Sequence, residues 1–217
     1  MIYDTYRGVF NLDLLEGIVP SGPMGIPTVF RTDAVPSELI PFDKAVSSKD
    51  YGCWVHFFIH DAQFQRIWRD PWRYLPILGR FAGAIAPDFS VMWGYEPFVQ
   101  FESICRSRII ASWLQRNGLD VIPVVRWGKE VTYPFAFEGI EPGGTVAVGT
   151  VGCMRDREAR DVFLNGFPVM LDTVRPRTVV VYGSIRDEMA DAADHAGVSL
   201  VQRQSATAQV FSHKGAE

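Results

Sequence analysis

The chain has 217 residues, 47% of them hydrophobic and 21% charged, with 21 basic and 25 acidic side chains. This length and balance fit one globular domain with a sizeable core and exclude an intrinsically disordered chain. No apolar run approaches the about 18 residues of a membrane span, and the first residues lack a secretory pattern. The three cysteines are too scattered for a disulfide scaffold. We therefore expect a soluble cytoplasmic protein.

The charges are unevenly distributed along the chain. Residues 62–129 carry nine basic and five acidic side chains, whereas both flanking segments are net acidic. Seventeen of the 21 basic residues are arginines, which bind phosphate or carboxylate through two parallel hydrogen bonds. The net charge of −4 argues against a general nucleic-acid binder but is compatible with DNA binding through a local basic face. The alternative is that nearby carboxylates pair with these arginines on the surface.

Residues 1–50 contain many turn-forming residues and are interpreted as an N-terminal lead-in packed on the core. Two short apolar pieces in it, 26–30 and 38–42, could add strands. Residues 51–217 are expected to form a single domain of β-α repeats. Its predicted strands, separated by helical segments, are 54–61, 83–90, 119–128, 144–152, 178–184 and 198–204. The predicted helices are 62–81, interrupted by Pro71, and 97–118, 157–176 and 186–197.

Strands that alternate with helices in this way are typical of an α/β fold with a mostly parallel sheet. We expect a compact TIM-barrel-like fold, and the alternative is an open doubly wound sheet. Neither the dinucleotide-binding G-x-G-x-x-G pattern nor the phosphate-binding P-loop pattern occurs, and the histidines and cysteines lack metal-ligand spacing. No cofactor and no metal are therefore expected.

Active sites of parallel α/β proteins lie at the carboxyl ends of the strands, so the residues that end each strand are the candidates. Asp88 and Asp61 end two of the predicted strands and are the candidate catalytic residues, because a pair of carboxylates can cleave a glycosidic bond. For each the alternative is a helix or turn cap. His56 is interpreted as a core histidine. The candidate substrate-binding residues are Phe89, Ser90, Gln100, Arg106, Arg108, Arg126, Trp127, Thr150, Tyr182 and Ser184.

Several blocks of this sequence resemble an uncharacterised family, a domain of unknown function spread through Gram-positive bacteria, their phages and mobile elements. The blocks are LIPFDKAVSSKDYGCWVHFFIHD, APDFS, the polar helix 100–118, VIPVVRWG and VGTVGC, within roughly residues 39–204. The phage setting of the resemblance implies nucleic-acid metabolism or phage–host conflict. His60, where the family often has a carboxylate, and Cys105, where an aromatic residue is common, depart from its pattern.

These residues support a first hypothesis: cleavage or exchange at a nucleobase N-glycosidic bond in DNA. The analogy is to base-excising and base-exchanging enzymes on (β/α) barrels, in fold and residue type only. Asp88 would stabilise or attack the sugar and Asp61 would assist; Trp127 and Phe89 would stack on a flipped base and Gln100 would read its edge. Arg106, Arg108 and Arg126 would hold phosphate. The alternatives are a non-catalytic interaction module, with Trp68, Trp72 and Trp93 in its interface, and a hydrolase of small glycosides or nucleotides.

Overall fold

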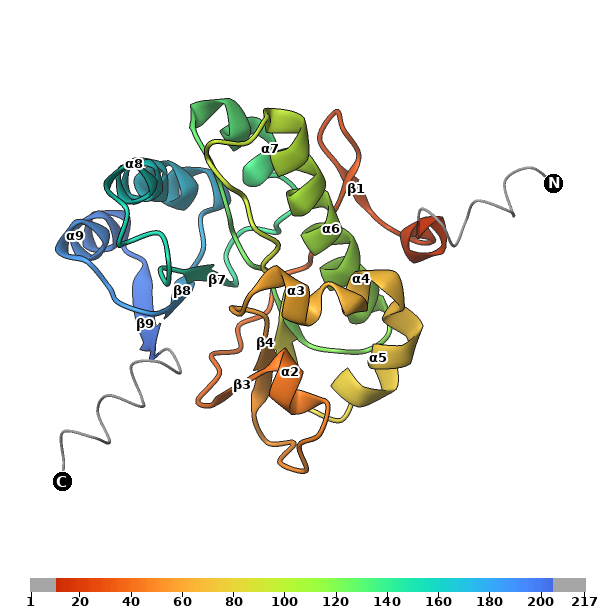
Figure 1. Ribbon diagram of the computed structural model, residues 1–217. Helices are drawn as coiled ribbons and strands as arrows, with labels where there is room; N and C mark the ends of the chain where they lie inside the picture. The colour runs from red at the N-terminus through yellow and green to blue at the C-terminus, as the bar shows by residue number, and fades with distance from the viewer. Residues whose placement is uncertain (1–10, 205–217) are drawn as a thin grey trace, which may run out of the picture.

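The computed structural model describes residues 11–204; the ends of the chain at 1–10 and 205–217 lie outside the described residues. The chain forms an α/β fold in which two parallel sheets are surrounded by helices (Figure 1). The strands are β1 (Pro20–Ser21), β2 (Ile26–Pro27), β3 (Leu39–Pro41), β4 (Trp54–His56), β5 (Gly83–Ile85), β6 (Val121–Ile122), β7 (Thr145–Gly149), β8 (Thr178–Tyr182) and β9 (Ser199–Arg203).

The longer helices are those that the apolar periodicity predicts, with ends that differ by one to two residues. They are α6 (Pro97–Arg116), α8 (Arg157–Val174) and α9 (Asp187–Ala196). Gly118 follows α6 with φ 87°, a left-handed conformation that favours glycine and ends the helix. The segment predicted as a helix over 62–81 interrupted by Pro71 is instead three short helices, the last of which begins at Pro71. The remaining helices are η1 (Leu12–Leu15), α2 (Phe42–Ala45), α3 (Asp61–Phe64), α4 (Arg66–Arg69), α5 (Pro71–Leu78), η2 (Glu130–Thr132) and α7 (Tyr133–Ala136).

The main sheets contain strands in chain order. One has the order β3-β4-β5-β6 and the other β7-β8-β9, and every pairing in them is parallel. A single parallel bridge between Val124 and Ala147 connects the two sheets. The segment 38–42 therefore contributes β3 to the sheet, while 26–30 contributes β2 to a separate antiparallel hairpin with β1.

The closed barrel that the sequence favours is not formed among the described residues, and the open alternative fits the two sheets. No ladder pairs β3 with β9; instead, the Nε of Arg203 donates to the carbonyl of Pro36, 2.6 Å away. A cavity of about 300 Å³ lies between these two edges, lined by both of them and by His56 and Tyr182. The edge strands are thus too far apart for backbone pairing, and one long arginine side chain spans the gap.

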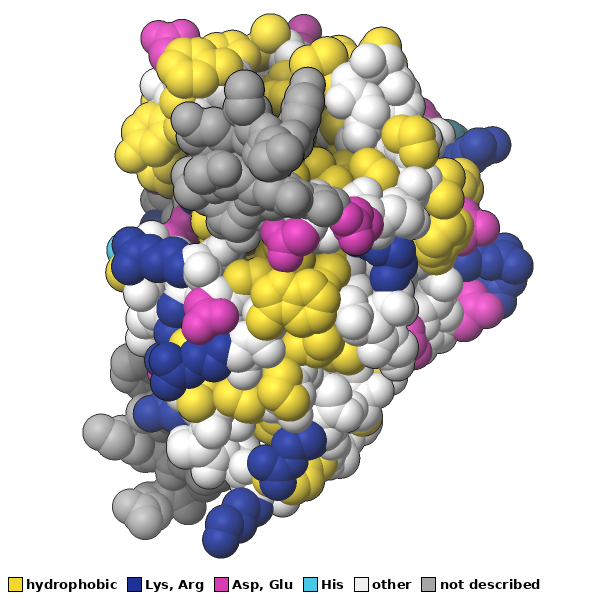
Figure 2. Space-filling model, turned by 90° about the vertical axis from the view of Figure 1, so that its right-hand side faces the viewer, with side chains coloured by type: hydrophobic (Ala, Val, Ile, Leu, Met, Phe, Trp, Pro, Cys, Tyr) yellow, Lys and Arg dark blue, Asp and Glu magenta, His cyan; other side chains and the backbone are white. Residues whose placement is uncertain are grey.

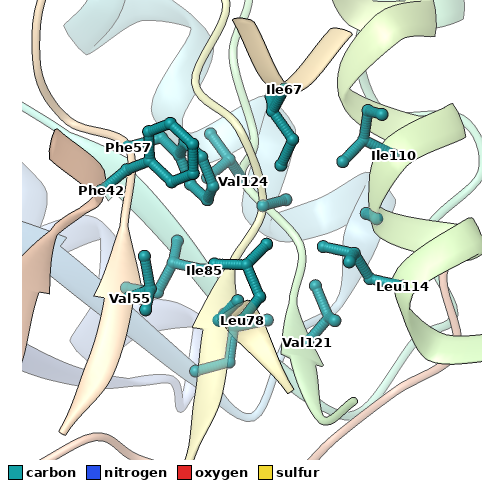
Figure 3. Packing of buried hydrophobic residues seen from close by; sticks show 14 of the residues in the cluster. Phe42, Val55, Phe57, Ile67, Leu78, Ile85, Ile110, Leu114, Val121 and Val124 are labelled. Atoms are coloured by element: carbon teal, nitrogen blue, oxygen red, sulfur yellow. The ribbon is translucent and has the colours of Figure 1, made fainter. Parts of the chain in front are cut away.

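Two apolar layers cover the outer faces of the sheets. Val55, Ile85 and Val121 pack against residues of α5 and α6, including Leu78 and Leu114 (Figure 3). On the other sheet, the outward valines of β7 and β8 pack against the buried face of α8 and against α9, which lie over that sheet in Figure 1. Burial of these layers holds the strand ends in fixed positions and so places the residues that follow the strands.

Candidate functional site

A groove at the carboxyl ends of the parallel strands is built from two adjoining cavities. The first has a volume of about 640 Å³ and contains the carboxylates of Asp61 and Asp88. Ser90, Ser103 and Arg126 also line it, together with apolar residues that include Phe58 and Val99. The second, about 400 Å³, is lined largely by aromatic and aliphatic side chains, including Trp93, Trp127 and Phe163. The residues that line both cavities are His60, Ser90, Met92, Arg126 and Val151.

Asp88 and Arg126 form a buried ion pair on the floor of this groove. The Asp88 side chain is only 5% exposed, and its two oxygens accept hydrogen bonds from Nε and Nη2 of Arg126. Nη1 of Arg126 also donates to the carbonyl of Gly149, 3.2 Å away. Burial by itself would lower the pKa of Arg126, but the adjacent Asp88 carboxylate outweighs it and raises that pKa. The Asp88 carboxylate is therefore paired rather than a cap.

Asp61 has a different environment from Asp88. It is the first residue of α3, and His60 rather than Asp61 is the N-cap, so the capping interpretation of Asp61 is wrong. Its carboxylate accepts from the backbone N–H of Ser90 at 3.1 Å and from the Ser90 hydroxyl at 2.8 Å. These bonds orient the carboxylate, and no cation of the described residues is paired with it directly. Asp61 thus keeps lone pairs that can accept further hydrogen bonds.

A loop between β5 and α6 forms one wall of the groove. It carries Met92 and Tyr95, which are about half exposed, and Trp93, whose ring lies 4.8 Å from the Nζ of Lys129. The buried side chain of Gln100 donates from Nε2 to the carbonyl of Tyr95 at 2.7 Å and anchors this loop to the start of α6. Gln100 therefore supports the wall from behind and does not line either cavity.

Trp127 is buried and stacks on Phe163, with ring centroids 4.8 Å apart. Its Nε1 donates to the carbonyl of Val162 at 3.3 Å. Phe89 is also buried and packs against Phe64 from within the core. Neither ring has the free face that stacking on a base requires, although Trp127 still contributes an edge to the second cavity.

The remaining candidate residues lie outside the groove. Arg108 is 1% exposed and donates to the carbonyls of Val124, Ala136 and Glu138, which leaves it no access to a phosphate in the groove. Burial lowers its pKa to about 10. Arg106 pairs with Glu102 at 2.7 Å on the outer face of α6.

Three further candidates, Thr150, Tyr182 and Ser184, lie at the carboxyl ends of β7 and β8. The Thr150 hydroxyl is buried and donates to the carbonyl of Ser184 at 3.0 Å, which ties two strand ends together. Tyr182 stacks on Phe58 and lines the separate cavity between the sheet edges. His56 lies beside it in the core, as the sequence predicts, and burial lowers the pKa of His56 to about 4.

Sequence reasoning missed three contributors to the groove. His60 was set aside because it lacks metal-ligand spacing, although it lies at the carboxyl end of the predicted strand 54–61, where site residues of parallel sheets are found. The wall residues 91–96 have no periodicity to identify them. Cys153 lines the second cavity, where burial outweighs Arg126 and raises the pKa of its thiol, so it remains protonated at neutral pH.

The basic face expected from the composition is not a continuous field on the side shown in Figure 2. Basic and acidic side chains are interspersed there, with apolar atoms exposed between them. Arg155, in the loop before α8, and Arg157, the first residue of α8, are exposed next to Asp156 and Glu158. No group of three or more potential metal ligands occurs within residues 11–204. Over the same range, none of the helices has the length and apolar character needed to cross a membrane.

The fold and this groove define an open α/β protein with a polar and an aromatic cavity side by side at the carboxyl ends of its strands. The chain belongs to the domain of unknown function family DUF4417, whose model matches residues 19–198. It is similar to the Gene 1 protein of Mycobacterium phage L5, 30% identical over 189 residues that cover 85% of this chain and 82% of that protein. The Gene 1 protein of Mycobacterium phage D29 is likewise 30% identical over 189 residues, covering 85% of this chain and 70% of the relative. No solved structure matches.

Proposed function

We propose that this protein cleaves or exchanges the N-glycosidic bond of a nucleobase in DNA. The observation that carries the proposal is a pair of cavities that meet at shared residues, the first containing the carboxylates of Asp61 and Asp88 and the second the rings of Trp93, Trp127 and Phe163. A nucleotide unit has the same division: a planar, largely apolar base joined to a polar sugar and phosphate. With the base in the aromatic cavity and the sugar in the polar one, the glycosidic bond lies at their junction.

The two carboxylates take different roles in this proposal from those that the sequence indicated. Because both oxygens of Asp88 are bound by Arg126, Asp88 holds that guanidinium in place and balances its charge. Asp61, oriented by Ser90, is the group that accepts a proton from an attacking water or stabilises positive charge at the sugar carbon. In a base exchange, an incoming base would replace the water.

DNA, rather than a free nucleotide, is favoured by the mouth of the groove. Met92, Tyr95 and Val151 line the groove and are 49 to 58% exposed, so apolar surface continues out of the cavities. Such a rim suits bases next to the one that is bound, since base–aromatic stacking contributes about 1–3 kcal/mol per base. The exposed Arg155 and Arg157 lie in the chain between Cys153 and Ala159, which both line the aromatic cavity. Arg157 pairs with Asp161 at 3.9 Å, so Arg155 is the arginine proposed to contact phosphate.

The test is base release from oligonucleotides with normal, methylated and deaminated bases, followed by mass spectrometry, with free nucleotides assayed in parallel. We expect the wild-type protein to release one base, and Asp61→Asn to reduce the rate at least about 100-fold because it removes the proton acceptor. The matched control is Asp156→Asn, an isosteric change at the N-cap of α8, which asparagine also caps.

Three other outcomes count against the proposal. Release from free nucleotides alone would make the protein a small-nucleotide hydrolase. Equal rates for Asp61→Asn and the control would remove Asp61 from the chemistry. No release from any substrate, together with a stable complex with a protein partner, would favour a non-catalytic interaction module.

A further inference from the structure

His60 occupies the junction of the two cavities. It follows β4 and precedes α3, and it is one of the residues that line both the polar and the aromatic cavity. Among the described residues that line these cavities, it is the one imidazole. In the proposed arrangement of sugar and base, a group at this place is within reach of the departing base.

The capping interactions of His60 orient its ring. Nδ1 accepts a hydrogen bond from the backbone N–H of Ala62 at 3.4 Å, and the backbone N–H of His60 donates to Oε1 of Gln63 at 3.2 Å. A neutral imidazole that accepts at Nδ1 carries its hydrogen on Nε2. The cap therefore orients the ring and leaves Nε2–H as a donor that the cap does not use.

Resting on the proposed function, we infer that His60 donates a hydrogen bond from Nε2 to the leaving base and stabilises it as the glycosidic bond breaks. The bond between the sugar carbon and the base nitrogen breaks, and its electron pair leaves with the base. Water adds to the sugar carbon and gives a proton to Asp61, and the released base takes a proton from solvent. Nδ1 of His60 keeps its contact with the N–H of Ala62 throughout. The inferred contribution is electrostatic stabilisation of negative charge that develops in the transition state.

The reciprocal cap with Gln63 allows the chemical and the structural role of His60 to be separated. His60→Ser creates the sequence S-x-x-Q, which is a standard capping box. The change removes the imidazole, while the serine hydroxyl can still accept a hydrogen bond from the first turn of α3. Gln63→Ala removes the other half of the cap and leaves the imidazole. If His60 acts only as a helix cap, Gln63→Ala should impair activity at least as much as His60→Ser does. If His60 stabilises the leaving base, His60→Ser should impair activity more than Gln63→Ala does.

The readout is single-turnover base release from paired oligonucleotides whose bases differ in leaving-group ability: uracil against 5-fluorouracil, and guanine against 7-methylguanine. We expect His60→Ser to slow release of the poorer leaving group by about 100-fold or more, the loss that follows removal of one transition-state donor. For the better leaving group we expect a loss of less than about 10-fold, since less charge then needs stabilisation. Gln63→Ala should release both bases at nearly the wild-type rate.

An equal loss on both members of a pair, or a loss in Gln63→Ala as large as that in His60→Ser, would overturn the inference and leave the proposed function in place. If the wild-type protein releases neither base of either pair and no base in the wider panel, the proposed function and this inference fail together.

Discussion

The most informative perturbation is Asp88→Asn, because the ion pair with Arg126 gives it a consequence for stability before any consequence for activity. The Asp88 side chain is 5% exposed and that of Arg126 23% exposed, so substitution leaves a guanidinium largely buried without its counter-ion. Removing one partner of a buried pair costs about 3–5 kcal/mol. Arg126 keeps the carbonyl of Gly149 and some contact with solvent, so we take the lower end, about 3 kcal/mol.

For a chain of this size, 1 kcal/mol shifts the melting temperature by about 2–4 °C, so the expected decrease is roughly 6–12 °C. The assay is urea unfolding followed by circular dichroism, supported by thermal melting. In the double variant Asp88→Asn/Arg126→Gln, part of the loss should be recovered, since neither an unpaired charge nor an unpaired carboxylate remains. The reasoning would be refuted if Asp88→Asn unfolded at the same urea concentration as the wild type. It would also be refuted if the loss of stability in the double variant equalled the sum of the losses in the two single variants.

Three further predictions concern the core. His56 has a pKa of about 4 in the folded protein and 6.5 in a free histidine, so protonation as pH falls from 6.5 to 4 should favour the unfolded state by at most about 3 kcal/mol. Urea midpoints measured across that pH range check this. If the midpoint depends on pH as steeply in His56→Gln as in the wild type, the prediction is contradicted. Arg108→Met should destabilise the fold by about 3 kcal/mol or more, because three buried carbonyls lose their donor; an unchanged denaturation midpoint would argue against a structural role. Gly166→Ala places a Cβ 2.3 Å from Nε1 of Trp127, so the indole ring or α8 must shift. The expected cost is about 1–3 kcal/mol, with altered tryptophan fluorescence. Unaltered melting and fluorescence would show that the contact is not tight.

Local patterns in the sequence predicted the elements well where burial is regular along the element. The apolar periodicity of α8 follows from packing on one face, and the continuous valine-rich runs of β7 and β8 follow from burial on both faces. The region 62–81 was harder to interpret, because its apolar spacing persists across three short helices. The spacing of apolar residues indicates which face of a helix is buried, but it does not indicate where the backbone hydrogen bonds of one helix end and those of the next begin.

The candidate site illustrates the same limit in its side chains. The rule that chemistry gathers at the carboxyl ends of parallel strands placed Asp61, Asp88, Ser90 and Arg126 around one cavity. It did not indicate that Asp88 pairs with Arg126, nor that Asp61 is held by Ser90, 29 residues away in the chain. Those partners come from different strand ends and are selected by three-dimensional proximity.

The sequence by itself determined the α/β class, the parallel pairing, the family membership and the strand ends from which the groove is built, because each of these depends on local patterning. Only the tertiary structure decided that the sheet remains open, that Arg108 and Gln100 support the fold, and that His60 stands between the two cavities. Each of these features depends on which polar groups are buried next to each other in the folded chain. The cost of desolvating those groups and the distances between them decide the pairing, and residues close in the sequence do not indicate it.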